Sequence, residues 1–374
     1  MKSHYLLRNF LARNGSQWLP RIIRPLRMKK FLAFALPLFC TASVFAADVA
    51  YTKPVGGMTV AVPSGQTRAV SLPLLGSVVG NGAVIGSITG IGSNYIDVSN
   101  AGWTSGAFSN AANPYLLRIT SGAAAGRVMP VSATSNTATR LNLTNDGMAI
   151  DQVVSPAVGD RYELVLADTL ATFFGATTLQ GGPDAQSADL VQIWSNTSWV
   201  SYYYNTTRSR WERSTDTAAS ASRDNTLLRQ DRGFLIVRRA STPLTMYVTG
   251  RVPDVATKHG HLAPGVTLFS HGLPAPTTLS GLALNTQIPG WRGASSSSTA
   301  LAGADLVQIW GNTAWVSYYF DTTKGSWQRT TDTSNSASRD AIQLAPGQAF
   351  LIRRLDAPSS PAQNFITATL PYSI

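Results

Sequence analysis

The sequence predicts an all-β protein. After residue 47, no stretch places apolar residues at the i, i+3, i+4, i+7 spacing of an amphipathic helix. Short runs rich in Val, Ile, Thr, Tyr and Trp occur instead, interrupted by Gly, Asn, Ser and Pro roughly every eight to twelve residues. Examples are residues 58–62, 115–119, 161–165 and 234–237. We expect an N-terminal antiparallel β module followed by two homologous β-sandwich or partly open barrel domains, with one short helix near residues 169–174.

The first 46 residues predict an export signal. They contain a positive start, an apolar segment and a small-residue cleavage site, namely Lys29-Lys30, residues 31–39 and Val44-Phe45-Ala46. Met28 directly precedes the two lysines, so it is a second candidate start that would make residues 1–27 an extension. The apolar segment is too short for a membrane-spanning helix. We therefore expect an exported mature chain without a transmembrane segment.

The positive charge is concentrated in this signal. Residues 1–46 hold eight of the 30 Lys and Arg and no Asp or Glu, which leaves 22 basic and 19 acidic residues and changes the net charge from +11 to +3. So small an excess argues against a nucleic-acid-binding surface. Cys40 is the only cysteine, and the bulky Phe39 before it disfavours lipidation. Cleavage after Ala46 would leave no thiol for a disulfide, for catalysis or for a metal.

An internal repeat organises most of the remaining chain. The run of residues 189–194, Asp-Leu-Val-Gln-Ile-Trp, recurs 116 residues later, and 30 of 51 positions are identical between residues 189–239 and 305–355. A unit this long indicates a duplicated domain, because solenoid repeats span about 20–50 residues. The expected division is an N-terminal β module at 48–152, a first repeat domain at 153–254 and a second repeat domain at 262–374.

Several short segments of the mature chain form a further pattern. They are Pro54-Val55-Gly56, Ser121-Gly122-Ala123-Ala124-Ala125-Gly126-Arg127, Ser135-Asn136-Thr137, Gly159-Asp160, and Thr169-Leu170 followed by Phe173-Phe174. On these segments the chain resembles an uncharacterised family of exported, β-rich bacterial proteins along nearly its whole mature length. The resemblance implies export and a β-rich fold, and it brings no known activity or catalytic residues.

Each repeat predicts three antiparallel strands with one aromatic face. A four-residue turn would pair Trp194 with Trp199, and a second turn of five residues would set Trp211 opposite Tyr203. Because side chains alternate along a strand, one face then collects indole, phenol, amide and guanidinium groups in both repeats. The candidate residues are Gln192, Trp194, Trp199, Tyr203, Trp211 and Arg213, and in the second repeat Gln308, Trp310, Trp315, Tyr319, Trp327 and Arg329.

This aromatic face has two interpretations. Indoles edged by polar groups suit the stacking of a sugar ring, and they equally suit a protein interface hot spot. Alternatively, the rest of each domain covers the face, with Arg213 and Arg329 stacked on Trp as internal cation–π pairs. The sequence leaves both interpretations open.

Other chemistry-bearing groups are few. His259, His261 and His271 could form a zinc site with an open position, although Gly260 and Pro264 mark the same segment as a loop. Acidic and basic residues recur in Ser/Thr-rich turns and predict structural roles, namely Asp216, Asp332, Arg223-Asp224 and Arg339-Asp340. The sequence contains no phosphate-binding loop, nucleophile elbow or zinc-protease motif. We predict no catalytic residue and no cofactor.

These observations favour a non-enzymatic secreted or cell-surface structural and interaction protein. It would use its duplicated aromatic faces on a protein or polysaccharide at the cell surface, or on its own copies. The alternative is a carbohydrate-binding protein with one aromatic site per repeat. Metal-dependent hydrolysis at the three histidines is a weaker hypothesis. We expect the chain to be exported across the inner membrane, to the cell surface, the medium or the periplasm.

Overall fold

The computed structural model of the chain describes residues 54–76, 84–144, 149–151, 154–195, 197–260, 264–356 and 365–373, without the side chains of residues 259 and 260. The expected export signal, Met28 and Cys40 lie outside the described residues, as does His261. Among the described helices, none is long and apolar enough to cross a membrane.

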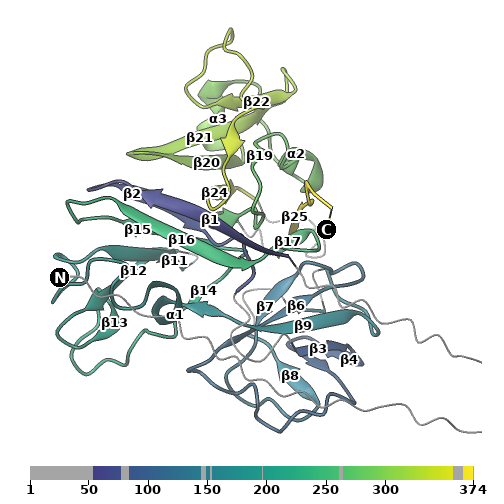
Figure 1. The fold of residues 1–374 in the computed structure, drawn as a ribbon. Helices are drawn as coiled ribbons and strands as arrows, with labels where there is room; N and C mark the ends of the chain where they lie inside the picture. Colours follow the sequence, from purple (N-terminus) through teal and green to yellow (C-terminus); the bar gives the residue numbers. More distant parts are fainter. Residues whose placement is uncertain are drawn as a thin grey trace, which may run out of the picture. The chain divides into compact units, whose positions relative to one another are not determined.

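Antiparallel β-sheets are the main regular structure of the described chain, which confirms the all-β prediction (Figure 1). The described helices are short: α1 (Leu170–Phe174), α2 (Leu284–Gln287) and α3 (Ser297–Gly303). The expected helix is α1. It begins at Thr169 because the hydroxyls of Thr169 and Thr172 each accept a hydrogen bond from the backbone N–H of the other residue.

The first repeat is built on a five-stranded sheet. Its strands lie in the order β13 (Arg210–Arg213), β12 (Trp199–Asn205), β11 (Leu190–Trp194), β15 (Gly233–Val237) and β2 (Thr67–Ser71). A two-stranded ribbon, β1 (Val55–Val62) with β16 (Leu244–Arg251), packs on one face of this sheet. Alternate residues of the ribbon, such as Val60, Val62 and Met246, are buried against the sheet in a common apolar core.

The second repeat has the same strand arrangement. Its sheet runs in the order β22 (Ser326–Arg329), β21 (Ala314–Asp321), β20 (Leu306–Gly311), β24 (Ala349–Arg354) and β18 (Gly265–Ser270). Its ribbon is β17 (Thr257–Gly260) with β25 (Phe365–Ala368). A short pair also occurs in each repeat: β10 (Asp168–Thr169) with β14 (Leu227–Leu228), and β19 (Thr277–Thr278) with β23 (Gln343–Leu344).

The sheets cross the expected division at residue 152. Strands β1 and β2 fall in the segment expected to belong to the N-terminal module, yet they pair with β16 and β15 of the first repeat. Ser71 pairs with Gly233 as Ser270 pairs with Ala349, so β2 occupies in the first repeat the place that β18 occupies in the second. A separate β module interrupts the first repeat between β2 and β10.

This inserted module has two sheets and its own core. One sheet has the order β3 (Val84–Ser87), β9 (Arg161–Leu166), β6 (Tyr115–Ile119) and β7 (Val128–Pro130). The other has the order β4 (Gly90–Gly92), β5 (Tyr95–Asp97) and β8 (Arg140–Asn142). A buried ion cluster joins the module to β16, because Glu163 lies 2.9 Å from guanidinium nitrogens of both Arg118 and Arg251.

The two repeats pack against each other through equivalent strands. Val70 bridges to Gln348, and the counterpart residues Phe269 and Arg232 form the reciprocal bridge. The contact is tight at its centre, where a Cβ atom added to Gly233 would lie 2.2 Å from the Cβ of Ala349. These residues are themselves counterparts, 116 positions apart. The repeats therefore meet about a local two-fold relationship.

Candidate functional site

The aromatic face is only partly assembled as the sequence predicted. Strands β11 and β12 have the expected register, with Trp194 opposite Trp199 and Gln192 opposite Ser201. The same register recurs in the second repeat, where Trp310 lies opposite Trp315. In each pair the two indoles make an edge contact with ring centroids 5.1 Å apart.

Trp211 and Arg213 lie on the opposite face from the one predicted. The turn between β12 and β13 is one residue shorter than expected, so Tyr204 rather than Tyr203 lies opposite Trp211. A shift of one residue moves a side chain to the other face of the sheet. Trp211 is consequently 1% exposed in the core, and its indole N–H donates to the carbonyl of Gly175 at 3.2 Å.

The second repeat has the same strand register. Trp327 lies opposite Phe320, is 1% exposed and belongs to the core. Arg329 lies opposite Tyr318, as Arg213 lies opposite Tyr202. These two Trp and two Arg residues therefore do not form part of an aromatic binding surface.

Tyr203 is buried in a polar cluster on the predicted face. Its hydroxyl donates to Glu212 at 3.2 Å, and the Asn205 amide donates to the same carboxylate at 2.9 Å. Burial raises the pKa of Glu212, but hydrogen bonds from Arg208 and Arg210 outweigh it and lower the pKa to about 2. This cluster is a structural support for the end of β12.

Tyr319 has a different buried partner. Its hydroxyl lies 3.3 Å from Asp321, and burial raises its pKa to about 12. Asp321 is the counterpart of Asn205, and Gln328 is the counterpart of Glu212. Each repeat thus holds one carboxylate and one amide at these positions, with their places exchanged.

The remaining aromatic residues lie at the contact between the repeats. Trp194, Trp199, Trp310 and Trp315 are half-buried and pack on one apolar cluster formed by both sheets. The indole N–H of Trp194 donates to the carbonyl of Val266 in β18 at 2.6 Å. The indole N–H of Trp310 donates to the carbonyl of Thr67 in β2 at 2.7 Å.

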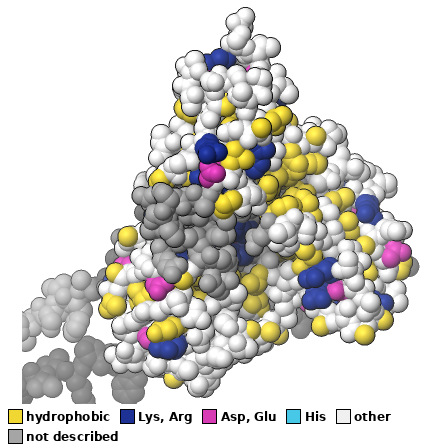
Figure 2. All heavy atoms as spheres, turned by 180° about the vertical axis from the view of Figure 1, so that it is seen from behind, with side chains coloured by type: hydrophobic (Ala, Val, Ile, Leu, Met, Phe, Trp, Pro, Cys, Tyr) yellow, Lys and Arg dark blue, Asp and Glu magenta, His cyan; other side chains and the backbone are white. Residues whose placement is uncertain are grey.

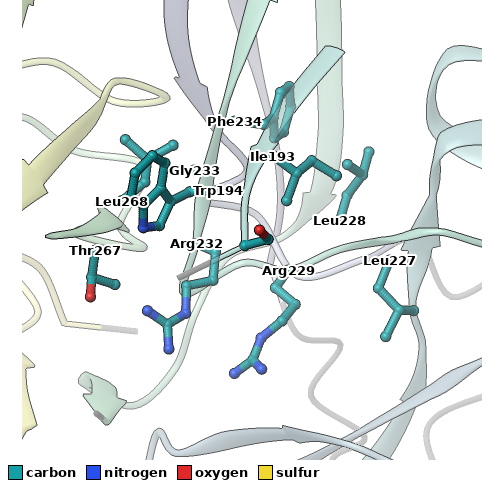
Figure 3. A pocket seen from close by; sticks show the side chains of 11 residues that line it. Ile193, Trp194, Leu227, Leu228, Arg229, Arg232, Gly233, Phe234, Thr267 and Leu268 are labelled. Atoms are coloured by element: carbon teal, nitrogen blue, oxygen red, sulfur yellow. The ribbon is translucent and has the colours of Figure 1, made fainter. Parts of the chain in front are cut away.

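A pocket of about 330 Å³ opens beside Trp194, and we name it the Trp194 pocket (Figure 3). It lies where the first repeat meets β18 of the second repeat. Its volume falls within the range of natural small-molecule sites. Its lining combines apolar side chains, hydroxyl groups, one indole and two guanidinium groups: Ile193, Trp194, Ser195, Leu227, Leu228, Arg229, Arg232, Gly233, Phe234, Thr267 and Leu268.

The pairing of β11 with β15, beside the pocket, is shorter than the equivalent pairing of β20 with β24. In the first repeat the pairing of β11 with β15 ends at Gln192 and Leu235. In the second repeat the equivalent pairing continues one step further, to Ile309 and Phe350. Ile193 and Phe234, which would be the next pair of this ladder, both line the Trp194 pocket.

No protein family, curated protein or solved structure matches the chain. The chemistry of the pocket must therefore be derived from its own residues.

The charged side of the pocket comes from the turn before β15. Arg229 makes a bidentate pair with Asp231, with nitrogen–oxygen distances of 2.8 and 2.6 Å, and Arg232 lies 3.7 Å from the same carboxylate. Figure 3 shows both guanidinium groups pointing in the same direction, away from the ring of Phe234. The Arg232 guanidinium also lies over the Phe269 ring at 5.3 Å.

Sequence reasoning identified Trp194 but missed Arg229 and Arg232. The available signal was a departure from the repeat. Residues 229–232 read Arg-Gln-Asp-Arg, whereas their counterparts at 345–348 read Ala-Pro-Gly-Gln. The residues predicted from the sequence are those that both repeats share, whereas Arg229 and Arg232 occur in only one repeat.

The other sequence candidates have structural surroundings. The ring of His271 is buried, with Nε2 3.2 Å from the carbonyl of Ala345 and Nδ1 accepting from the N–H of Leu273 at 3.3 Å. Burial lowers the pKa of His271. The described residues contain no group of three or more His, Cys, Asp or Glu placed to hold a metal. The side chains of His259 and His261 lie outside the description.

The repeated acidic and basic turn residues pair with each other. Arg223 binds Asp216 through two hydrogen bonds of 2.8 and 2.9 Å, and Arg339 binds Asp332 in the same way. Asp224 accepts a hydrogen bond from the backbone N–H of Trp211 at 2.8 Å. These are the structural turn roles that the sequence predicted.

The exposed charge is dispersed on the face that Figure 2 shows. Lys and Arg side chains form small separate groups there, several of them beside Asp or Glu.

Proposed function

We propose that the mature chain is an exported, non-enzymatic binding protein that holds a saccharide in the Trp194 pocket. The observation that carries the proposal is the lining, where an indole and apolar side chains stand beside hydroxyl and guanidinium groups. A sugar ring presents a matching combination, because its C–H face is apolar while its hydroxyls need fixed hydrogen-bond partners. Export is inferred from the sequence of residues 28–46.

The lining supports binding rather than catalysis. Its ionisable side chains are the guanidinium groups of Arg229 and Arg232, which stay protonated and so cannot exchange a proton with a substrate. Guanidinium groups instead supply several donors in a fixed planar array, which suits recognition. The nearby carboxylate of Asp231 is engaged by Arg229.

The positions of the indoles support carbohydrate binding over association through the aromatic faces. Association through the whole aromatic faces requires the indoles to meet an external partner. Trp194 and Trp310 instead use their N–H groups between the repeats, and their rings pack on the shared apolar cluster. The pocket at the edge of this cluster is the part with room for a ligand, which favours the carbohydrate-binding alternative.

The proposal is tested by calorimetric titration of the full chain with a panel of neutral and acidic oligosaccharides. The paired variants are Trp194→Phe and Trp310→Phe, since each loses the same kind of indole hydrogen bond to the opposite repeat. We expect both to lose similar stability, and only Trp194→Phe to weaken saccharide binding, by about tenfold.

A third variant separates binding from stability. Ser195 is exposed and lines the pocket, so Ser195→Phe should obstruct the pocket while leaving the indole contact in place. We expect this variant to melt like the wild type and to bind poorly. Failure of every saccharide to bind the wild type, or equal binding losses in Trp194→Phe and Trp310→Phe, would overturn the proposal.

A further inference from the structure

We infer that the ligand of the Trp194 pocket is an acetylated saccharide, whose acetyl group lies against Ile193 and Leu227 while Thr267 binds the sugar on the other side of the pocket. The inference rests on the proposed function and specifies the class of saccharide. It also predicts one such site per chain, in place of the one site per repeat expected from the sequence, because the counterpart of Leu227 in the second repeat is Gln343.

One side of the pocket is apolar. Figure 3 shows Ile193, Leu228 and Leu227 there, apart from Trp194 and Thr267 on the other side. Sugar hydroxyls placed against these apolar side chains would lose hydrogen bonds to water, which costs free energy. A methyl group would gain free energy at the same place, because apolar area is removed from water. A ligand that spans the pocket therefore needs an apolar substituent beside its polar ring.

The size of the pocket limits this substituent. The volume of about 330 Å³ lies near the lower end of the range of natural small-molecule sites, which is about 300–1,000 Å³. A sugar ring on Trp194 therefore leaves room for a short group rather than for a long acyl chain. An acetyl group carries one methyl group and one carbonyl, so it suits an apolar side within a partly polar pocket.

The accessible apolar surface distinguishes the first repeat from the second. Ile309 pairs with Phe350 and is 8% exposed, whereas Ile193 lies one step beyond the end of the equivalent pairing and is half-buried. Leu227 is also half-buried, and its counterpart Gln343 is exposed. The short pairs β10–β14 and β19–β23 form with either residue, so strand pairing alone does not require a leucine at position 227.

Thr267 supplies a polar group on the side of the pocket where Trp194 lies. Thr267 is 9% exposed, and among the described residues none forms a hydrogen bond with its hydroxyl. A buried hydroxyl without a partner costs free energy. A sugar hydroxyl or the acetyl carbonyl would provide this partner, so the polar side of the pocket offers a hydrogen bond to the ligand.

The test uses the full chain and three neutral probes of equal length: a cello-oligosaccharide, its O-acetylated form, and a chito-oligosaccharide, in which an acetamido group replaces one hydroxyl of each ring. Calorimetry measures affinity, and the two acetylated probes identify whether an ester or an amide is preferred. We expect the preferred acetylated probe to bind at least about fivefold more tightly than the cello-oligosaccharide. The formyl analogue of the preferred probe lacks only the methyl group and should bind about fourfold more weakly than the acetyl form.

The substitution Leu227→Gln gives the first repeat the residue of the second. It should weaken binding of the acetylated probe about fivefold and leave binding of the cello-oligosaccharide unchanged. The control is Gln343→Leu, the reverse change at the equivalent position, which should leave both affinities unchanged. Leu227 also packs on apolar residues of the inserted module. The comparison of formyl and acetyl probes on the wild type therefore decides the question where Leu227→Gln is unstable.

The substitution Thr267→Val tests the polar side of the pocket. Valine keeps the shape of the side chain and its preference for a strand. We expect the variant to melt like the wild type, because the described chain has no hydrogen bond to this hydroxyl to lose, and to bind every probe about fivefold more weakly. Unchanged affinities would remove Thr267 from the site.

The outcomes separate the two proposals. Equal affinities of the wild type for the cello-oligosaccharide and both acetylated probes, or for the formyl and acetyl forms, would refute the acetyl group while saccharide binding stands. Binding of none of the probes, including the neutral and acidic panel, would remove the proposed function as well.

Discussion

The indole N–H of Trp194 and the backbone carbonyl of Val266 form a 2.6 Å hydrogen bond that joins the two repeats. The relationship is reciprocal, because Trp310 donates to Thr67 at 2.7 Å and these two residues are the counterparts of Trp194 and Val266. Each repeat thus uses its own Trp to bind the strand that the other repeat holds at its edge. The Trp194 pocket lies beside one of these two contacts.

Loss of either indole hydrogen bond should destabilise the chain to a similar extent. Trp194→Phe and Trp310→Phe each leave a carbonyl at the repeat contact without its donor, and we expect each to reduce the free energy of unfolding by about 1–3 kcal/mol. Urea denaturation of the wild type and both variants measures the free energy of unfolding. A reduction confined to one of the two variants would show that the contacts are not equivalent.

A methyl group added at the centre of the contact between the repeats should destabilise the chain. Gly233→Ala would place a Cβ 2.2 Å from the Cβ of Ala349, and we expect a loss of about 1–3 kcal/mol from overpacking. Ala349→Gly in the same chain removes the opposing methyl group and should restore part of the loss. A double-mutant cycle by denaturation checks the coupling, and simple additivity would contradict the close contact.

The exchange of carboxylate and amide between the two repeats predicts that a second substitution restores stability lost in Glu212→Gln. Glu212→Gln removes the acceptor of Arg208 and Arg210 and should destabilise the first repeat. Adding Asn205→Asp recreates the arrangement of Asp321 and Gln328, so part of the stability should return. Thermal melting of the wild type, Glu212→Gln and the double variant provides the comparison, and a double variant less stable than Glu212→Gln would contradict the exchange.

Glu212 also predicts that the free energy of unfolding depends on pH. The pKa of Glu212 is lowered from 4.5 to about 2 in the folded chain, so its carboxylate stabilises the fold above pH 4.5 and this stabilisation is lost as the pH falls toward 2. Glu212→Gln has no such carboxylate. The difference in unfolding free energy between wild type and variant should therefore be largest above pH 4.5 and should shrink toward pH 2. A difference that is constant across this range would contradict the lowered pKa.

The buried ion cluster should contribute more to stability than a half-buried pair in the same module. Glu163→Gln leaves the guanidinium groups of Arg118 and Arg251 without this carboxylate in a buried site, and we expect a loss of about 3–5 kcal/mol. The control is Asp97→Asn, which breaks a more accessible pair with Arg140, whose side chains are 31% and 41% exposed, and should cost much less stability. Equal effects in denaturation would show that burial does not set the strength of the cluster.

Local patterns predicted the strands and one of the two hairpin registers. The pairing of Trp194 with Trp199 follows from a short turn between two strongly aromatic strands. The pairing of Trp211 was wrong by one residue, because the length of the turn after Asn205 cannot be read from residues that suit several turn types. That single residue decides whether an indole lies in the core or on the binding face.

The place of β2 could not be predicted for a different reason. The strand has only five residues, and the inserted module separates it from the rest of its sheet. Its similarity to β18 is too slight to be recognised in a single sequence. The pocket depends on this long-range assembly, since Thr267 and Leu268 come from the other repeat.

The most direct test of saccharide binding at the Trp194 pocket is nuclear magnetic resonance of the indole N–H signals, assigned through single Trp→Phe variants, as an oligosaccharide that binds the chain is added. We predict that the Trp194 signal moves with saturation at one equivalent while the Trp310 signal stays in place. Movement of both signals together, or of neither while the saccharide binds, would contradict a binding site at the Trp194 pocket.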